Sequence, residues 1–190
     1  MSDSSHLIRR ALEAGAGALS RAAAADTSLI ARAADAIAER VLADGTLFAF
    51  GNGGSAADAE HLAAELVGRF GKDRRPLAAH ALTTSSSSVT AIANDYGFEQ
   101  VFARQVRGLA GAGDVCVGIS TSGGSANVIR GLEAARETGA LAIALTGRDG
   151  GALAKAADIA IIVAEESTAR IQEVHRAIIH AICEVIEARL

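Results

Sequence analysis

Five short, almost wholly apolar runs recur along the 190-residue chain, with helix-like segments between them. They lie at residues 46–50, 77–82, 114–120, 140–146 and 158–163. Strands without alternating polar residues cannot leave either face in water, so they belong in a parallel sheet that crossover helices cover on both faces. The fold class is therefore expected to be α/β, a three-layer α-β-α sandwich with a five-stranded, mostly parallel sheet.

Helical patterns account for most of the remaining chain. Two alanine-rich patterns, 3–25 and 27–44, precede the first apolar run, and Asp26 or Thr27 can cap the second of them. Further helices are expected near 97–110, 125–138 and 168–190, whereas TTSSSS at 83–88 is a short low-complexity patch. A chain of this length fits one domain with a substantial core, so residues 1–190 are predicted to form a single domain.

Composition argues against two classes of protein. The formal net charge of −4 and an aromatic content of 3% are unlike those of a nucleic-acid binder. No apolar run approaches the roughly 20 residues of a membrane span, and the first residues lack the layout of an export signal, so a cytoplasmic protein is expected.

The one local basic cluster, GKDRRP at 71–76, indicates a solvated connector or, alternatively, an arginine that faces a site.

Two glycine-rich loops follow apolar runs and suit a phosphate group. GNGGS at 51–55 permits close approach of a ligand, although it is also ordinary turn chemistry. STSGGSANV at 120–128 can surround a phosphate with hydroxyl and backbone N–H donors, the alternative being a hydroxyl-rich helix cap. It lacks the lysine of a nucleoside triphosphatase and the GxGxxG pattern of a dinucleotide site. A phosphomonoester such as a sugar phosphate remains.

His61 and Glu65 stand four residues apart in the helix pattern after the first of these loops. That spacing places both on one helix face, where they can hold a cation or substrate, although a surface hydrogen bond uses the same spacing. In the last helix His180 lies among isoleucines and needs a partner, whereas Gln172 and His175 lie on more polar ground. Gln172 and His180 are about 12 Å apart along the axis and on different stripes, so one metal can join them only if both lean inward.

Five motifs occur in order along the chain, namely GNGGSAADAEHLAAEL, TAIANDYGFE, GISTSGGSANVI, LTGRDGG and ARIQEVH. Together they strongly resemble the phosphoheptose isomerases of the sugar isomerase (SIS) fold, over nearly the whole chain. The resemblance implies conversion of D-sedoheptulose 7-phosphate to D-glycero-D-manno-heptose 7-phosphate, the first step of bacterial nucleotide-activated heptose synthesis. It also implies one zinc ion per subunit and a homotetramer with active sites at subunit interfaces, with neither nucleic acid nor membrane as a partner.

The resemblance assigns the site residues motif by motif. The zinc ligands would be His61, Glu65, Gln172 and His180. Substrate contacts would fall on Asn52, Gly53, Gly54, Ser55, Glu65, Asn94, Asp95, Ser120, Thr121, Ser122, Ser125 and Gln172. Glu65 suits the base that moves a proton between C2 and C1, and the resemblance gives His180 the complementary acid/base role. The two helices within 1–44 would supply a surface for assembly.

Two alternative hypotheses remain. Tetrameric regulators of replication initiation that bind the initiator DnaA are non-catalytic scaffolds of this fold, but they typically lack the residues present here as Glu65 and His180. Isomerases of shorter sugar phosphates, such as arabinose 5-phosphate, usually carry appended regulatory domains that would not fit in this length.

The chain departs from the phosphoheptose isomerases at Ser85, where an acidic residue is common, and at Gly124, where a larger polar residue is frequent. The isomerase is therefore the favoured hypothesis.

Overall fold

One five-stranded sheet forms the centre of the structure, a computed structural model that describes residues 3–190. Its strands are β1 (Leu47–Gly51), β2 (Ala79–Ala81), β3 (Val115–Ser120), β4 (Leu141–Gly147) and β5 (Ile159–Val163). Their spatial order is β2-β1-β3-β4-β5, and every neighbouring pair is parallel. The predicted five strands are confirmed, and the sheet they form is parallel throughout.

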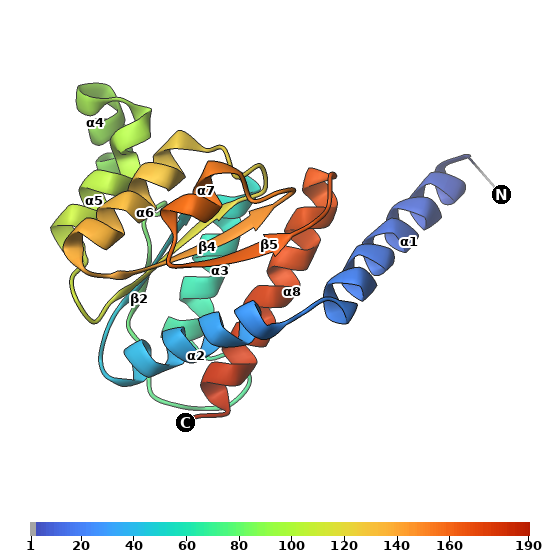
Figure 1. The fold of residues 1–190 in the computed structure, drawn as a ribbon, viewed down its shortest axis with the longest axis horizontal. Helices are drawn as coiled ribbons and strands as arrows, with labels where there is room; N and C mark the ends of the chain where they lie inside the picture. The colour runs from blue at the N-terminus through green and yellow to red at the C-terminus, as the bar shows by residue number, and fades with distance from the viewer. Residues whose placement is uncertain (1–2) are drawn as a thin grey trace.

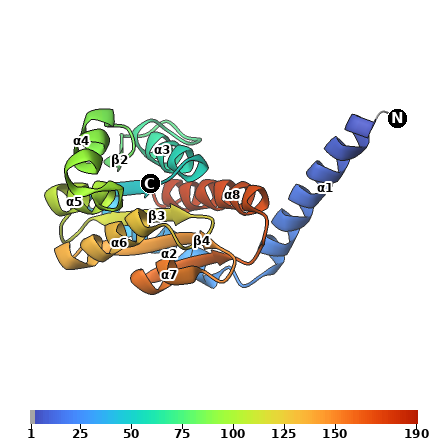
Figure 2. The same ribbon diagram turned by 90° about the horizontal axis from the view of Figure 1, so that it is seen from above.

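Helices cover both faces of this sheet (Figures 1 and 2). On one face lie α2 (Ser28–Leu42), α3 (Gly54–Val67) and α8 (Thr168–Glu187), and on the other lie α5 (Val101–Leu109), α6 (Ala126–Thr138) and α7 (Gly151–Ala156). Alternate strand residues enter alternate cores, so that in β1 Leu47 and Ala49 face one layer while Phe48 and Phe50 face the other. Two apolar layers explain the lack of polar alternation and confirm the three-layer sandwich.

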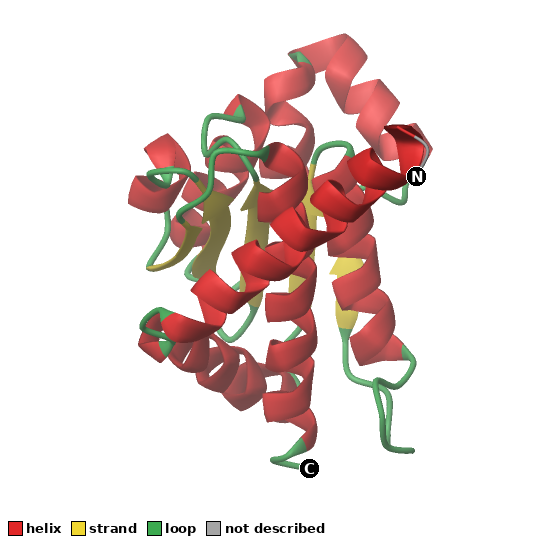
Figure 3. Cartoon of the chain, turned by 90° about the vertical axis from the view of Figure 1, so that its right-hand side faces the viewer, coloured by secondary structure: helices red, strands yellow, loops and turns green. Residues whose placement is uncertain are grey.

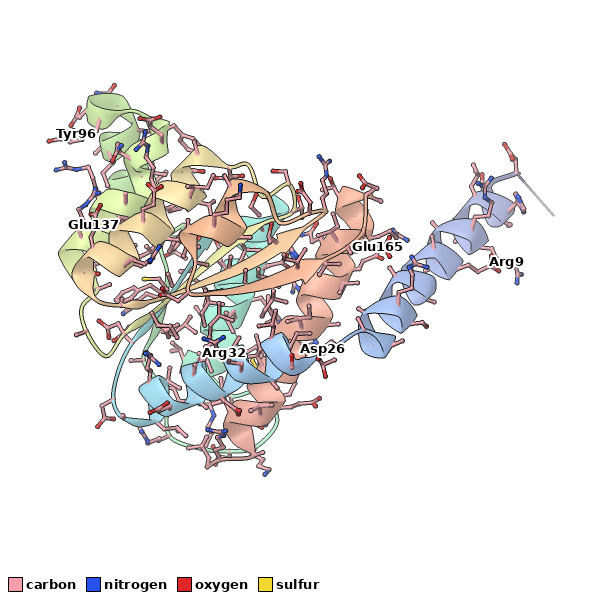
Figure 4. All side chains as sticks on the ribbon, in the orientation of Figure 1. Arg9, Asp26, Arg32, Tyr96, Glu137 and Glu165 are labelled. Carbon is pink, nitrogen blue, oxygen red and sulfur yellow. The ribbon has the colours of Figure 1, made fainter. Side chains whose placement is uncertain are left out.

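The N-terminal helix α1 (Asp3–Ala24) projects away from this body (Figure 1) and points toward the viewer in Figure 3. Only its Gly15 and Ala18 are buried, whereas Leu7, Ile8 and Leu12 are 55%, 60% and 70% exposed. Arg9, labelled in Figure 4, lies on the same outlying part of the helix. Among residues 3–190, no helix combines the length and the apolar character required to cross a bilayer. Both predicted N-terminal helices are present, and the first leaves much of its apolar surface uncovered.

Two helices lie where no sequence pattern predicts them. The helix α4 (Ser86–Tyr96) begins inside the serine-rich patch, because Ser85 Oγ accepts a hydrogen bond from the Ser88 N–H and caps the helix. Ser85, which stands where an acidic residue was expected, therefore acts as the helix cap. No residue of α4 is buried, which leaves it without a strong apolar stripe. The helix α7 is only 6 residues long, too short for a recognisable period.

The segment before β2 also differs from the prediction. Only Ala79–Ala81 of the apolar run 77–82 pair with β1, at one edge of the sheet. The Leu77 N–H donates instead to the Leu66 carbonyl of α3 at 3.0 Å. This bond ties the segment to the end of the helix that carries His61 and Glu65. A further predicted helix, 97–110, is divided into a short 3₁₀ turn, η1 (Phe98–Gln100), and α5.

Candidate active site

The loops after β1 and β3 meet at the carboxyl edge of the sheet. The chain leaves β1 toward β2 on one side and later returns to β3 on the other, which is the switch point where sheets of this kind bind ligands. Asn52 of the first loop and Asn127 of α6 are joined there by two reciprocal amide hydrogen bonds, each 2.8 Å long. Asn127 is 3% exposed, so the pair anchors the first loop against the second. The two predicted ligand loops therefore lie together.

The second loop gathers hydroxyl groups. Ser120 Oγ lies 2.9 Å from Ser125 Oγ and 3.4 Å from Ser122 Oγ, and the Gly124 N–H donates to Ser122 Oγ at 3.2 Å. Gly123 has a φ of +67°, and a Cβ there would overlap the backbone of the loop after β4, so glycine is required. The cluster stands at the N-terminus of α6, whose partial positive charge favours an anion.

The first loop turns into α3 through Gly53, whose φ is +56°. The Ser55 N–H donates to the Asn52 carbonyl at 3.0 Å, and Ser55 is 6% exposed. In the second loop Thr121 is half-buried beside the serine cluster. Both loops thus keep backbone and hydroxyl donors at the beginning of a helix, as a phosphate site requires.

A row of polar side chains runs along the seam between α3 and α8, which lie side by side and run in the same direction. Gln172 lies against Gly54, where a Cβ would overlap its side-chain amide. One turn further along both helices, Arg176 Nη2 lies 2.6 Å from Oδ1 of Asp58, a carboxylate with 0% side-chain exposure. An imidazole pair follows one turn later. Residues of α3 therefore pair with residues of α8 at each successive turn.

His61, Glu65 and His180 form a cluster of potential metal ligands on this seam. Their ligand atoms all lie within 4.8 Å of one another. His61 Nε2 lies 2.9 Å from His180 Nε2 and 3.4 Å from Glu65 Oε1. Partial burial, together with the charge of Arg176, lowers the pKa of His61 and so favours the neutral imidazole that binds metals. The spacing of His61 and Glu65 on α3 brings them together as predicted, and α8 supplies the distant histidine.

The donor set of this cluster fits zinc. Zinc binds imidazole nitrogen and carboxylate oxygen, commonly in sets of three protein ligands plus an open position when it is catalytic. Two Nε2 atoms that face each other at 2.9 Å must share a proton between them, and a divalent cation can take the place of that proton. Other divalent metals that accept nitrogen and oxygen ligands suit the same residues.

The remaining predicted site residues lie elsewhere in the single chain. Gln172 contacts α3 at Gly54, seven residues and about 10 Å along the axis before His61. Asn94 and Asp95 are exposed on the last turn of α4 and bond to each other at 2.8 Å. The helices α4 and α1 project at opposite ends of the molecule (Figures 1 and 2), and Tyr96 in Figure 4 marks the end of α4. Among residues 3–190, no hydrogen bond or ion pair joins Asn94 or Asp95 to the histidine cluster.

The expectation for His175 is wrong. This histidine is 0% exposed, and its ring nitrogen Nε2 donates to the Thr146 carbonyl at the end of β4 at 3.0 Å. Burial lowers its pKa, so the ring is neutral. The sequence pattern misleads because α8 packs against the sheet and against α1, α2 and α3, which covers most of its circumference. His180, expected to be the more buried histidine, is half-buried.

Three residues of the site framework were missed from the sequence, namely Asp58, Asn127 and Arg176. Asp58 precedes His61 by three residues and Glu65 by seven, which places all three on one face of α3. That spacing was a usable signal. Asn127 and Arg176 offered none, because their importance depends on partners from distant elements.

Comparison with known proteins agrees with this geometry. The family model for the SIS domain matches residues 12–147, which defines the class of the chain. A phosphoheptose isomerase of Neisseria meningitidis is 56% identical over 162 residues, or 84% of this chain and 82% of its own. The solved structure of the Neisseria gonorrhoeae phosphoheptose isomerase matches with a TM-score of 0.91 at 46% identity, over 97% of this chain and 98% of its own. A phosphoheptose isomerase from Francisella tularensis gives 0.93 at 37% identity, over 99% and 100%.

The chain belongs to the SIS-domain family and, within it, to the phosphoheptose isomerases. It is therefore an isomerase, which answers the choice between an enzyme and a DnaA-binding scaffold in favour of the enzyme. The favoured hypothesis from the sequence motifs is confirmed at this level.

Proposed function

We propose that the chain interconverts D-sedoheptulose 7-phosphate and D-glycero-D-manno-heptose 7-phosphate in the cytoplasm, as the first step of nucleotide-activated heptose synthesis. The observation that carries the proposal is the cluster of His61, Glu65 and His180, which brings a carboxylate and two imidazoles to one point. The names of the relatives from Neisseria and Francisella support this substrate class.

The reaction moves a proton between C1 and C2 of the sugar through an enediolate, so it needs a base and an acid on the same site. Glu65 Oε1 faces His61, which leaves Oε2 to accept the proton from one carbon and return it to the other. His180 is the proposed complementary group: with Nε2 directed at the cluster, Nδ1–H is the proton that its imidazole can give to a substrate oxygen and recover. A zinc ion held by His61, Glu65 and His180 would polarise the carbonyl and stabilise the enediolate charge. Gln172, which lies against Gly54, is proposed as the fourth ligand and would have to turn toward the cluster to reach the ion.

Substrate binding is assigned to the two loops and to α4. The phosphate is proposed to lie against Ser120, Thr121, Ser122 and Ser125, where hydroxyls and the N-terminus of α6 converge. The sugar hydroxyls are assigned to Asn52, Gly53, Gly54, Ser55, Asn94, Asp95 and Gln172. The amide pair of Asn52 and Asn127 supports this assignment, because it holds a polar side chain at the mouth of both loops.

A homotetramer with shared sites is the proposed assembly of the single domain 1–190. Residues 1–44 include α1, whose exposed Leu7, Ile8 and Leu12 form an apolar surface that another copy can cover. The exposed Asn94 and Asp95 of α4 are also free to reach a site on a neighbouring copy. Size-exclusion chromatography with light scattering measures the subunit number directly.

The proposed activity is tested by incubating the purified chain with sedoheptulose 7-phosphate and zinc, and following the aldose product by NMR. Conversion that stops when a chelator removes the metal is the expected result. A folded, metal-loaded chain that leaves the ketose unchanged would exclude the proposal.

A further inference from the structure

The connection from α3 to β2 contains an inward-facing arginine. The Arg74 side chain is only 6% exposed, although it belongs to the basic cluster 71–76. Its Nη2 donates to the Glu65 carbonyl at 2.7 Å, and its Nη1 donates to the Leu66 carbonyl at 2.9 Å. The cluster is therefore not simply a solvated connector, because one guanidinium lies beneath the end of α3.

These bonds satisfy carbonyl groups in the last turn of α3. Helix ends leave carbonyl groups unpaired, and a glycine in the left-handed region commonly satisfies them. Here Gly68 follows the helix with a φ of −81°, and its N–H reaches only the Ala64 carbonyl. The Arg74 guanidinium donates to the next two carbonyls in the chain, and the Leu77 N–H donates to that of Leu66 as well. Glu65, the proposed base, therefore stands on a helical turn that Arg74 closes.

Glu187 in the last turn of α8 holds the same connection from the opposite side. Its carboxylate is 8% exposed and accepts hydrogen bonds from the N–H groups of Phe70, Gly71 and Lys72, at 3.0 to 3.2 Å. Arg74 Nε lies 3.6 Å from its Oε1. Burial opposes ionisation, but the three N–H donors and Arg74 together lower the pKa of Glu187, so the carboxylate is charged at neutral pH.

The segment 68–76 also contacts His180, the member of the metal cluster that α8 supplies. The Phe70 ring, whose N–H is bound by Glu187, lies with its centre 5.7 Å from that of the His180 ring. The segment 68–76 thus contacts Glu65 through Arg74 and His180 through Phe70. The contact of Phe70 with His180 is lost if the segment moves away from α8.

We propose that Arg74 and Glu187 are positioning residues for the metal and proton-transfer cluster, an inference that rests on the proposed function of that cluster. Their interaction fixes the segment 68–76 between α3 and α8, and thereby holds Glu65 and His180 at the separation that one cation requires. Residues that orient metal ligands from behind typically change metal affinity or activity about 10- to 100-fold when they are replaced.

The test compares Arg74→Gln, Glu187→Gln and the double variant with the parent chain. Zinc affinity of the metal-free proteins is measured by competition with a chromophoric chelator, and kcat and KM are measured with sedoheptulose 7-phosphate. Each single variant is expected to weaken zinc binding and to lower kcat by about 10- to 100-fold, with KM little changed. The double variant should be no worse than the more affected single variant, because both changes release the same segment. Glu187→Gln retains an acceptor oxygen, so it carries the test if Arg74→Gln does not fold.

Arg75→Gln is the matched control, because Arg75 is adjacent, 51% exposed and paired with the exposed Asp44. It should leave zinc affinity and kcat unchanged. A lower melting temperature in the Arg74 and Glu187 variants, with parental zinc affinity and parental kcat per folded molecule, would show a purely structural role and overturn the inference. Failure of the parent chain to convert the ketose would count against the proposed function alone, since the zinc measurements test the positioning role of Arg74 and Glu187 independently.

Discussion

The Nε2 atoms of His61 and His180 lie 2.9 Å apart, although 119 residues separate them in the chain. The strands before α3 and α8 are parallel members of one sheet, and each helix runs back along the same face, so the two helices share a direction. Their polar stripes therefore meet turn by turn, from Gly54 and Gln172 to Asp58 and Arg176 and then to the imidazoles. The site is a property of this alignment, since neither helix carries it alone.

Replacing Glu65 or His180 by glutamine should leave a folded, assembled chain with little activity. Glutamine is similar in size to both side chains but can neither accept nor release the transferred proton. We expect kcat to fall by about 10²- to 10⁴-fold in each variant, measured with sedoheptulose 7-phosphate. Glu60→Gln is the control, because Glu60 lies on the same helix, is exposed and accepts a hydrogen bond from the Thr83 hydroxyl away from the cluster. Near-parental turnover in either test variant would remove the acid/base assignment.

Asp58→Asn should destabilise the fold. The change removes a fully buried charge partner from Arg176, whose side chain is 38% exposed and can partly recover contact with water. The expected loss in the free energy of unfolding is about 1–3 kcal/mol, below the value for a wholly buried pair. Urea denaturation measures it. Glu137→Gln, which breaks the exposed pair with Arg107, should leave the urea midpoint unchanged, and an equal effect from both changes would contradict the importance of the seam.

Gly54→Ala should disturb Gln172. The backbone at Gly54 is compatible with alanine, but the added methyl group would overlap the Gln172 amide. We expect a loss of about 1–3 kcal/mol from overpacking, together with a raised KM if Gln172 contacts the sugar. In a Gln172→Ala background the same substitution should be nearly neutral for stability. An unchanged cost in that background would show that the two residues do not interact.

His175 should make stability depend on pH below neutrality. Burial lowers its pKa in the folded state, so unfolding takes up a proton once the pH falls below about 6.5, the value for an unfolded chain. The free energy of unfolding should therefore decrease as the pH falls through that value, until the folded-state pKa is reached. His175→Gln can still donate to the Thr146 carbonyl but does not titrate, so it should lose less stability over the same range. Urea midpoints on both sides of pH 6.5 compare the two proteins, and parallel losses would refute the role of His175.

The fold could be predicted from the sequence because its main signals are local. Continuous apolar runs such as 114–120 are visible without partners, and so is the alanine-rich pattern of α2. The helix α4 could not be predicted, because it contributes no buried residue and so shows no apolar stripe. The predicted run 77–82 was too long for a strand, because the Leu77 N–H donates to the Leu66 carbonyl of α3 and not to the sheet.

The site was predictable in part. The spacing of His61 and Glu65 and the hydroxyl loop are local patterns, and the resemblance added His180. Arg176 and Glu187 could not be identified, since each matters only through a partner more than 100 residues away. The burial of His175 was misjudged for the same reason, because the sequence of α8 alone does not show which of its faces other helices cover.

The in-register pairing of α3 and α8 also has a consequence for biosynthesis. A ribosome that adds about 5–20 residues per second needs about 6–24 s to travel from His61 to His180, 119 residues later. During that interval the nascent polypeptide carries only half of the binding site. Capture of the cation must therefore wait for translation of α8, and a stalled or truncated translation product would leave the carboxylate and first imidazole without their counterpart.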